Sequence, residues 1–160
     1  MNEGENNIPW WANKYPFPPD KKKPVLIKQE DEIYSNYGRG NDRITVQIFI
    51  STDKILLSAW IVPPGQSFQP PDIHTGDEPY YVLKGVATVC NPETGQVVEA
   101  KAGDVVFIPA GCWHETYNFG EDDMYLCAII EGKPWNPEAM KLVEEAVLHP
   151  VGYKMSSLEM

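Results

Sequence analysis

Residues 70–85 read PPDIHTGDEPYYVLKG and place one histidine among carboxylates. Asp72 lies two residues before His74, and Glu78 lies four residues after it. Side chains alternate between the two faces of a strand, so Asp72 and His74 share a face, as do Glu78 and Tyr80. A lone histidine is usually an ordinary surface or core residue. A metal site therefore requires further ligands from another part of the chain.

Residues 103–118, GDVVFIPAGCWHETYN, contain a second histidine in a regular spacing. The pattern is G-x5-P-x-G-x2-H-x3-N, on Gly103, Pro109, Gly111, His114 and Asn118. The earlier stretch continues as H-x3-E-x6-G, on His74, Glu78 and Gly85. Strand-like sequence separates the two patterns.

These two patterns resemble the two motifs of the cupin superfamily, over about residues 55 to 130. The second motif matches at every fixed position, and the first matches from its second histidine onward. The resemblance implies an all-β fold, an antiparallel double-stranded β-helix of the jelly-roll or cupin barrel type. Inward-facing residues on neighbouring strands of such a barrel point at a common centre. The resemblance also implies that His74, Glu78 and His114 hold a metal.

The chain departs from the family at Asp72, which stands where the first histidine of the motif is expected. Two interpretations remain open. Asp72 is a fourth ligand, which gives two histidines and two carboxylates, or the set is His74, Glu78 and His114, with open positions for solvent or substrate. Imidazole and carboxylate ligands suit a divalent transition metal, which could be iron, manganese, nickel, cobalt or zinc.

The resemblance implies a metal-dependent enzyme that acts on a small oxygenated organic molecule. Its chemistry would be that of an oxygenase or of an isomerase or lyase. The alternative is a non-catalytic cupin that binds and senses a small molecule, because the fold does not determine the reaction.

Two residues are the catalytic candidates, Glu78 and Tyr80. Tyr80 shares the parity of Glu78 and could act beside the metal as a hydroxyl donor or proton carrier. Its alternative role is that of a packed barrel aromatic. Neither motif contains an arginine, and Lys84 is the only basic residue of the first. This scarcity argues against a sugar phosphate or another strongly anionic substrate.

The rest of the chain predicts three parts. Residues 1–24 are rich in proline and aromatic residues, which favours an extended arm that lies on the domain or on a second subunit. Residues 25–132 alternate short β-type runs with turn signals and form the expected barrel. Residues 133–160 are expected to form a C-terminal helix and tail, because residues 136–149 carry an apolar stripe of helical period.

The composition of the chain argues against some classes of binding partner. The chain has 160 residues, which fits one domain, and its net charge of -10 argues against nucleic acid or a membrane as partner. No apolar run is long enough for a membrane-spanning helix, and the acidic start does not resemble a secretory signal, so a cytoplasmic location is expected. The three widely spaced cysteines indicate no disulfide framework. An acidic barrel with an aromatic arm suggests a homodimer.

Overall fold

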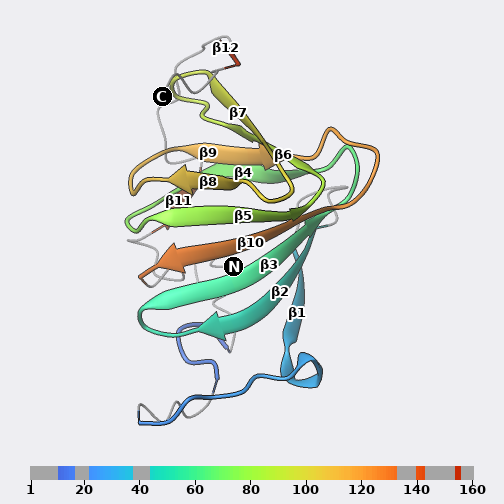
Figure 1. The fold of residues 1–160 in the computed structure, drawn as a ribbon. Coiled ribbons are helices and arrows are strands. Elements are labelled where there is room, and N and C mark those ends of the chain that lie inside the picture. The colour runs from blue at the N-terminus through green and yellow to red at the C-terminus, as the bar shows by residue number, and fades with distance from the viewer. Residues whose placement is uncertain (1–10, 17–21, 38–43, 133–139, 143–153, 156–160) are drawn as a thin grey trace, which may run out of the picture.

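The computed structural model describes residues 11–16, 22–37, 44–132, 140–142 and 154–155. It confirms the expected fold class: the described chain is almost entirely β, and its strands form two six-stranded sheets (Figure 1). The strand pairs are antiparallel, except for the parallel pair of β7 and β12. A short 3-10 helix, η1 (Gln29–Asp31), precedes the first strand.

The first sheet runs in the order β1-β2-β3-β10-β5-β8. Its strands are β1 (Ile33–Tyr37), β2 (Ile44–Ser51), β3 (Ile55–Val62), β10 (Met124–Glu131), β5 (Glu78–Lys84) and β8 (Val105–Ile108). The second sheet runs in the order β11-β4-β9-β6-β7-β12. Its strands are β11 (Met140–Leu142), β4 (Ser67–His74), β9 (His114–Tyr117), β6 (Val86–Cys90), β7 (Gln96–Lys101) and β12 (Lys154–Met155).

The core consists of alternate residues of strands from both sheets. In β2, Ile44, Val46 and Ile48 are buried while the residues between them are half-buried. They join one apolar cluster with residues of the second sheet, including Ala87 and Val89 of β6. Each fully buried aliphatic side chain stabilises the fold by about 1.5–3 kcal/mol. The period of two therefore determines which side chains face the interior.

The described part of the expected N-terminal arm packs on the barrel of its own chain. Trp11 and Tyr15 are buried and belong to the central apolar cluster. The backbones of Tyr15 and Ser51 exchange two hydrogen bonds, of 2.7 and 2.8 Å, which attach this segment to the end of β2. The other arm aromatics, Trp10 and Phe17, lie outside the described residues.

The expected C-terminal helix is not shown. Met140–Leu142, in the middle of the segment for which a helix was predicted, form strand β11 and pair with residues 72–74 of β4. For these three residues the helix prediction is wrong, because pairing with the edge of β4 supplies hydrogen bonds that outweigh a weak local preference. The other positions of that segment lie outside the described residues. The division at residues 24 and 132 stays a prediction.

Candidate metal centre

Three strand ends bring the four candidate ligands together. Asp72 and His74 close β4, Glu78 opens β5, and His114 opens β9. Strands β4 and β9 are neighbours, with Asp72 directly opposite His114 in the register. All four side chains are buried, with exposed fractions between 2% and 5%.

The turn between β4 and β5 depends on a glycine. A Cβ atom added to Gly76 would lie 2.2 Å from the carbonyl oxygen of Glu131 at the end of β10. Only glycine therefore allows the turn to approach β10 this closely. The turn therefore needs only the three residues between His74 and Glu78. The side chains of both His74 and Glu78 enter the same interior.

Two hydrogen bonds join this turn to the loop that precedes His114. The Asp77 carboxylate accepts a 2.9 Å hydrogen bond from the backbone N–H of Ala110. The backbone N–H of Gly111 donates a 2.8 Å hydrogen bond to the carbonyl of His74. The two motifs are thus held together by backbone and side-chain contacts that do not involve the ligands' own side chains.

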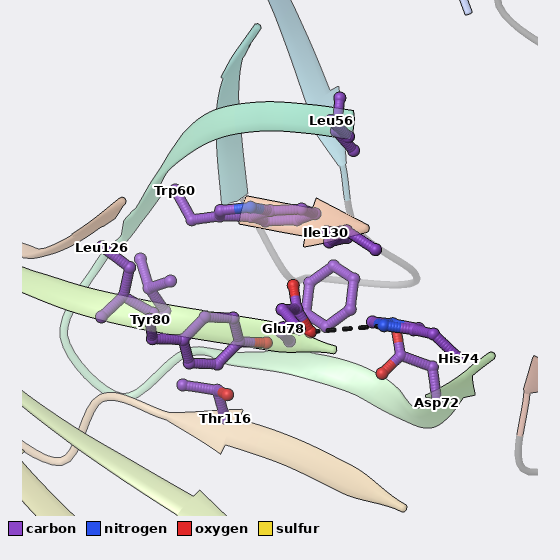
Figure 2. A pocket seen from close by; sticks show the side chains of 11 residues that line it. Leu56, Trp60, Asp72, His74, Glu78, Tyr80, Thr116, Leu126 and Ile130 are labelled. Carbon is purple, nitrogen blue, oxygen red and sulfur yellow. Dashed lines mark ion pairs between the residues drawn. The ribbon is translucent and has the colours of Figure 1, made fainter. Parts of the chain in front are cut away.

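The polar atoms of the cluster converge closely. His114 Nε2 lies 3.0 Å from both Asp72 Oδ1 and Glu78 Oε2. His74 lies between the same two carboxylates, with Nε2 3.5 Å from Asp72 Oδ2 and Nδ1 3.5 Å from Glu78 Oε2. Figure 2 shows Asp72 and His74 on one side of this group and Glu78 facing them, with the His74–Glu78 ion pair drawn as a dashed line.

These residues fit a metal ion. Asp72 Oδ1, His74 Nε2, Glu78 Oε2 and His114 Nε2 are all buried, and none of them has a hydrogen bond of normal geometry. They face one another in ion pairs of 3.0–3.5 Å. Buried polar atoms without well-formed hydrogen bonds are rare in folded proteins and costly, so a group of four requires an explanation. Asp72, His74 and His114 each offer a ligand atom, and these atoms lie within 4.8 Å of one another. An ion at their centre would satisfy them together.

The charges of the cluster are strongly coupled. Burial opposes ionisation of Asp72, but His114 and then His74 hold the pKa of its carboxyl at about 2. Burial likewise lowers the pKa of His114, and the Asp72 and Glu78 carboxylates outweigh this effect and raise it well above 6.5. Without a metal, His114 therefore carries a proton at neutral pH, in the position that a cation would occupy.

The orientation of His114 is set by the backbone. Its Nδ1 lies 3.0 Å from the carbonyl oxygen of Cys112. A carbonyl can only accept, so Nδ1 carries the hydrogen, and the lone pair of the neutral ring is on Nε2, which faces the cluster. A partner on the distant ring nitrogen is the usual way in which proteins fix a histidine that binds metal.

A cavity of about 40 Å³ adjoins the cluster and includes Asp72, His74 and Glu78 in its lining. Its apolar wall contains the aliphatic residues Leu56, Val62, Leu126 and Ile130. Trp60 and Phe68 complete the wall as an edge-to-face pair, with ring centroids 4.5 Å apart. This volume exceeds that of a single water site and is smaller than an engineered cavity that binds benzene, which is about 150 Å³.

Two hydroxyl groups complete the lining, those of Tyr80 and Thr116. Burial, and then the charges of Glu78 and Asp72, raise the pKa of Tyr80 well above 10, so its hydroxyl stays protonated. Figure 2 shows this hydroxyl directed toward Glu78, with Thr116 beside the ring. Thr116 Oγ1 is buried and lies near the Tyr80 hydroxyl, but makes no hydrogen bond of normal geometry.

The structure thus brings together every residue that the sequence suggested for the site: Asp72, His74, Glu78, Tyr80 and His114. Asn118 of the second motif lies elsewhere and braces the chain instead, because its side-chain amide donates to the carbonyls of Val62 and Asp122. Sequence reasoning missed the role of Asp77. Its only signal was an aspartate in a glycine-containing turn between two strands.

Two other expectations concern features outside the cluster. Cys90, Cys112 and Cys127 form no disulfide bond, as expected from their spacing. Within the described residues, no helix has the length and apolar character that crossing a membrane requires.

Comparison with known proteins gives a family match for the central part of the chain. The profile of the cupin domain matches residues 58–130, whereas no curated protein sequence matches the chain. The solved structures that resemble it include the polyketide cyclase RemF from Streptomyces resistomycificus, with 21% identity and a TM-score of 0.58 over 68% of this chain and 80% of that one. A predicted oxalate decarboxylase from Thermotoga maritima shares 23% identity, with a TM-score of 0.58 over 68% of this chain and 99% of that one.

A third similar structure is an RmlC-like cupin from Shewanella frigidimarina, with 15% identity and a TM-score of 0.56 over 69% of this chain and 92% of that one. Likeness at these identities concerns the fold alone. The profile match and the shared fold agree with the two motifs around His74 and His114. Over residues 58–130 the barrel of this chain is a cupin domain.

Proposed function

We propose that this protein is a metal-dependent cupin enzyme that acts on a small oxygenated organic molecule. One observation carries the proposal: four buried polar atoms without hydrogen bonds of normal geometry converge from two histidines and two carboxylates, and three of these residues line a small cavity. Structural metal sites are closed by their ligands, whereas catalytic sites adjoin space for a substrate. The cavity beside Asp72, His74 and Glu78 favours the catalytic kind.

The metal would be held by His74, His114, Asp72 and Glu78. The mixed nitrogen and oxygen set suits iron, manganese, nickel, cobalt or zinc. Bound there, the ion would supply Lewis-acid polarisation of a substrate oxygen or, if it is iron, oxygen chemistry. Asp72 contributes a second carboxylate in place of the first histidine of the family motif, which makes the set harder and more oxygen-rich.

The residues around the cluster support acid–base chemistry. Because Tyr80 stays protonated, its hydroxyl can donate a hydrogen bond or a proton to a substrate oxygen. Glu78 is close enough to influence that hydroxyl, and its carboxylate can accept a proton in exchange. The aliphatic wall excludes bulk water, which strengthens both interactions. We therefore assign Tyr80 and Glu78 as the catalytic pair.

Metal analysis tests this proposal. Protein purified without chelators should contain about one transition-metal ion per chain, and His114→Ala should remove it. Protein that holds no stoichiometric transition metal would overturn the proposal. Anaerobic loading with iron, followed by oxygen-uptake assays with candidate substrates, then separates oxygenase from isomerase or lyase chemistry. If His114→Ala keeps both turnover and ligand binding, metal catalysis is wrong.

Three wider expectations belong to the same proposal. The charge of -10 supports a protein that does not bind nucleic acid, and a cytoplasmic location is expected. A homodimer is the expected assembly, although Trp11 and Tyr15 pack on their own barrel; light scattering tests it directly, and a monomer would contradict it. The division into an arm (1–24), a barrel (25–132) and a tail (133–160) can be tested by limited proteolysis.

A further inference from the structure

We infer that Thr116 is the second anchor of the substrate, and that the substrate is a short, uncharged molecule with oxygens on neighbouring carbons. One oxygen would lie at the metal cluster, and the other would bond to the Thr116 hydroxyl. This inference rests on the proposed function and specifies its substrate class. It arises from three features of the cavity, which are an unpaired hydroxyl, a balance of charge and a small volume.

The first feature is the Thr116 hydroxyl. Thr116 is 2% exposed, lines the cavity, and makes no hydrogen bond of normal geometry through Oγ1. A buried hydroxyl is seldom left unpaired, because losing its bonds to water costs free energy that nothing returns. The neighbouring Tyr80 hydroxyl interacts with Thr116 but leaves it without a well-formed bond. A partner from within the cavity is therefore missing.

The position of Thr116 determines what that partner is. Thr116 follows His114 by two residues in β9, so both side chains point to the same face of the strand. Two residues of a strand span about 6.6 Å. A ligand whose first oxygen touches the cluster near His114 can reach Thr116 with a second oxygen that lies three bonds from the first, as in O–C–C–O. Oxygens on neighbouring carbons meet this condition.

The second feature is charge. Asp72 and Glu78 together carry two negative charges. A divalent ion would neutralise both charges, and no excess positive charge would remain for an anionic ligand. Among the described residues that line the cavity, none is lysine or arginine. Lys84, the basic residue of the first motif, is exposed and lies over the Tyr125 ring instead. A buried anion without a compensating cation is costly, so the site favours an uncharged ligand.

Size gives the third limit. The cavity of about 40 Å³ accommodates a group of few atoms beside the ion. An aromatic ring would require the wall formed by Trp60 and Phe68 to move. The part of the substrate that enters the cavity is therefore compact, with apolar atoms against the aliphatic wall.

Three probes of equal heavy-atom number test the inference. Hydroxyacetone has two neighbouring oxygens and no charge, 2-butanone replaces its hydroxyl by a methyl group, and glycolate replaces its methyl by a charged oxygen. Each is titrated into the cobalt-loaded protein and followed by the visible spectrum of the metal. Hydroxyacetone should bind more tightly than the other two. If glycolate binds more tightly, the uncharged class is wrong.

Variants of Thr116 test the anchor. Thr116→Val keeps the shape of the side chain and should weaken hydroxyacetone about tenfold, with no change for 2-butanone. Thr116→Ser, which restores a hydroxyl, should recover the affinity. Thr88→Val is the matched control, because Thr88 is another buried threonine and does not line the cavity. An unchanged affinity in Thr116→Val would show that Thr116 pairs only with water and would overturn the anchor.

The two proposals can fail separately. Cobalt stoichiometry, measured before any probe is added, tests the proposed function alone. If no cobalt binds, the proposed function is refuted. Calorimetric titration of hydroxyacetone into the metal-free wild type and into metal-free Thr116→Val then still tests whether Thr116 binds the ligand. If cobalt binds but Thr116→Val has no effect, only the second-anchor inference fails.

Discussion

Replacing Asp72 by asparagine removes one charge from the centre of the cluster and keeps the shape of the side chain. In the metal-free protein, Asp72 faces His114 at 3.0 Å, and both groups are buried. The pKa of Asp72 lies at about 2 instead of 3.8, a difference worth roughly 2 kcal/mol. Asp72→Asn should therefore lower the free energy of unfolding of metal-free protein by about this amount near pH 6.

The pH dependence gives this prediction a sign. Because folding lowers the pKa of Asp72, its contribution is present above pH 3.8 and is lost as pH falls toward about 2. The same interaction raises the pKa of His114, so the contribution is also lost as pH rises through that value. The difference between wild type and Asp72→Asn should be largest from pH 4 to neutral pH and should shrink at either extreme.

Metal affinity distinguishes the two ligand sets that the sequence left open. If Asp72 binds the ion, Asp72→Asn should weaken binding roughly 100-fold, because truncating one partner of a buried charge pair costs about 2–5 kcal/mol. Urea unfolding in the presence of chelator measures the stability, and competition with a chromophoric chelator measures the affinity. Asp104→Asn, at an exposed turn, is the control. Equal metal affinity in wild type and Asp72→Asn would refute Asp72 as a ligand.

Three further predictions follow from the same geometry. Metal binding should displace the proton of His114, whose pKa is raised in the metal-free protein, so the affinity for the metal should rise with pH through neutrality. Calorimetry in two buffers should detect the released proton, and metal binding at pH 7 without proton release would contradict this prediction. Gly76→Ala should lower the free energy of unfolding by about 2–3 kcal/mol, since its Cβ would lie 2.2 Å from a backbone oxygen. Urea titration should show a smaller loss of stability for the control Gly120→Ala. Equal losses of stability in the two variants would argue against a steric clash at Gly76. Tyr80→Phe should keep the metal and reduce turnover about 100-fold or more, and unchanged turnover would exclude Tyr80 as the proton donor.

The exposed fractions of the barrel strands show why the sequence predicted the barrel well and residues 140–142 poorly. In β5 and β10, buried and more exposed residues alternate with a period of two, and the same period is visible in the sequence. Local pattern and final environment agree there. At Met140–Leu142 they disagree, since the apolar stripe of a helix is also compatible with pairing along β4.

The candidate ligands were predictable because each belongs to a short motif with regular spacing. His74 and Glu78 stand four residues apart, and His114 follows a Pro-x-Gly turn. The distances between them were not predictable, because they depend on the Gly76 turn against β10 and on the bonds from Ala110 and Gly111. These contacts link positions more than thirty residues apart in the chain.

The sequence by itself determined the fold class, the family resemblance, the candidate residues and the scarcity of cations at the site, because spacing and composition carry this information. Only the tertiary structure decided that Asp72 enters the cluster and that Thr116 keeps an unpaired hydroxyl in the cavity. The alternation of side chains along a strand restricted Asp72 and Thr116 each to one of the two faces of its strand. Which atoms they meet depends on the pairing of β4 with β9, and that register arises from contacts across the whole barrel.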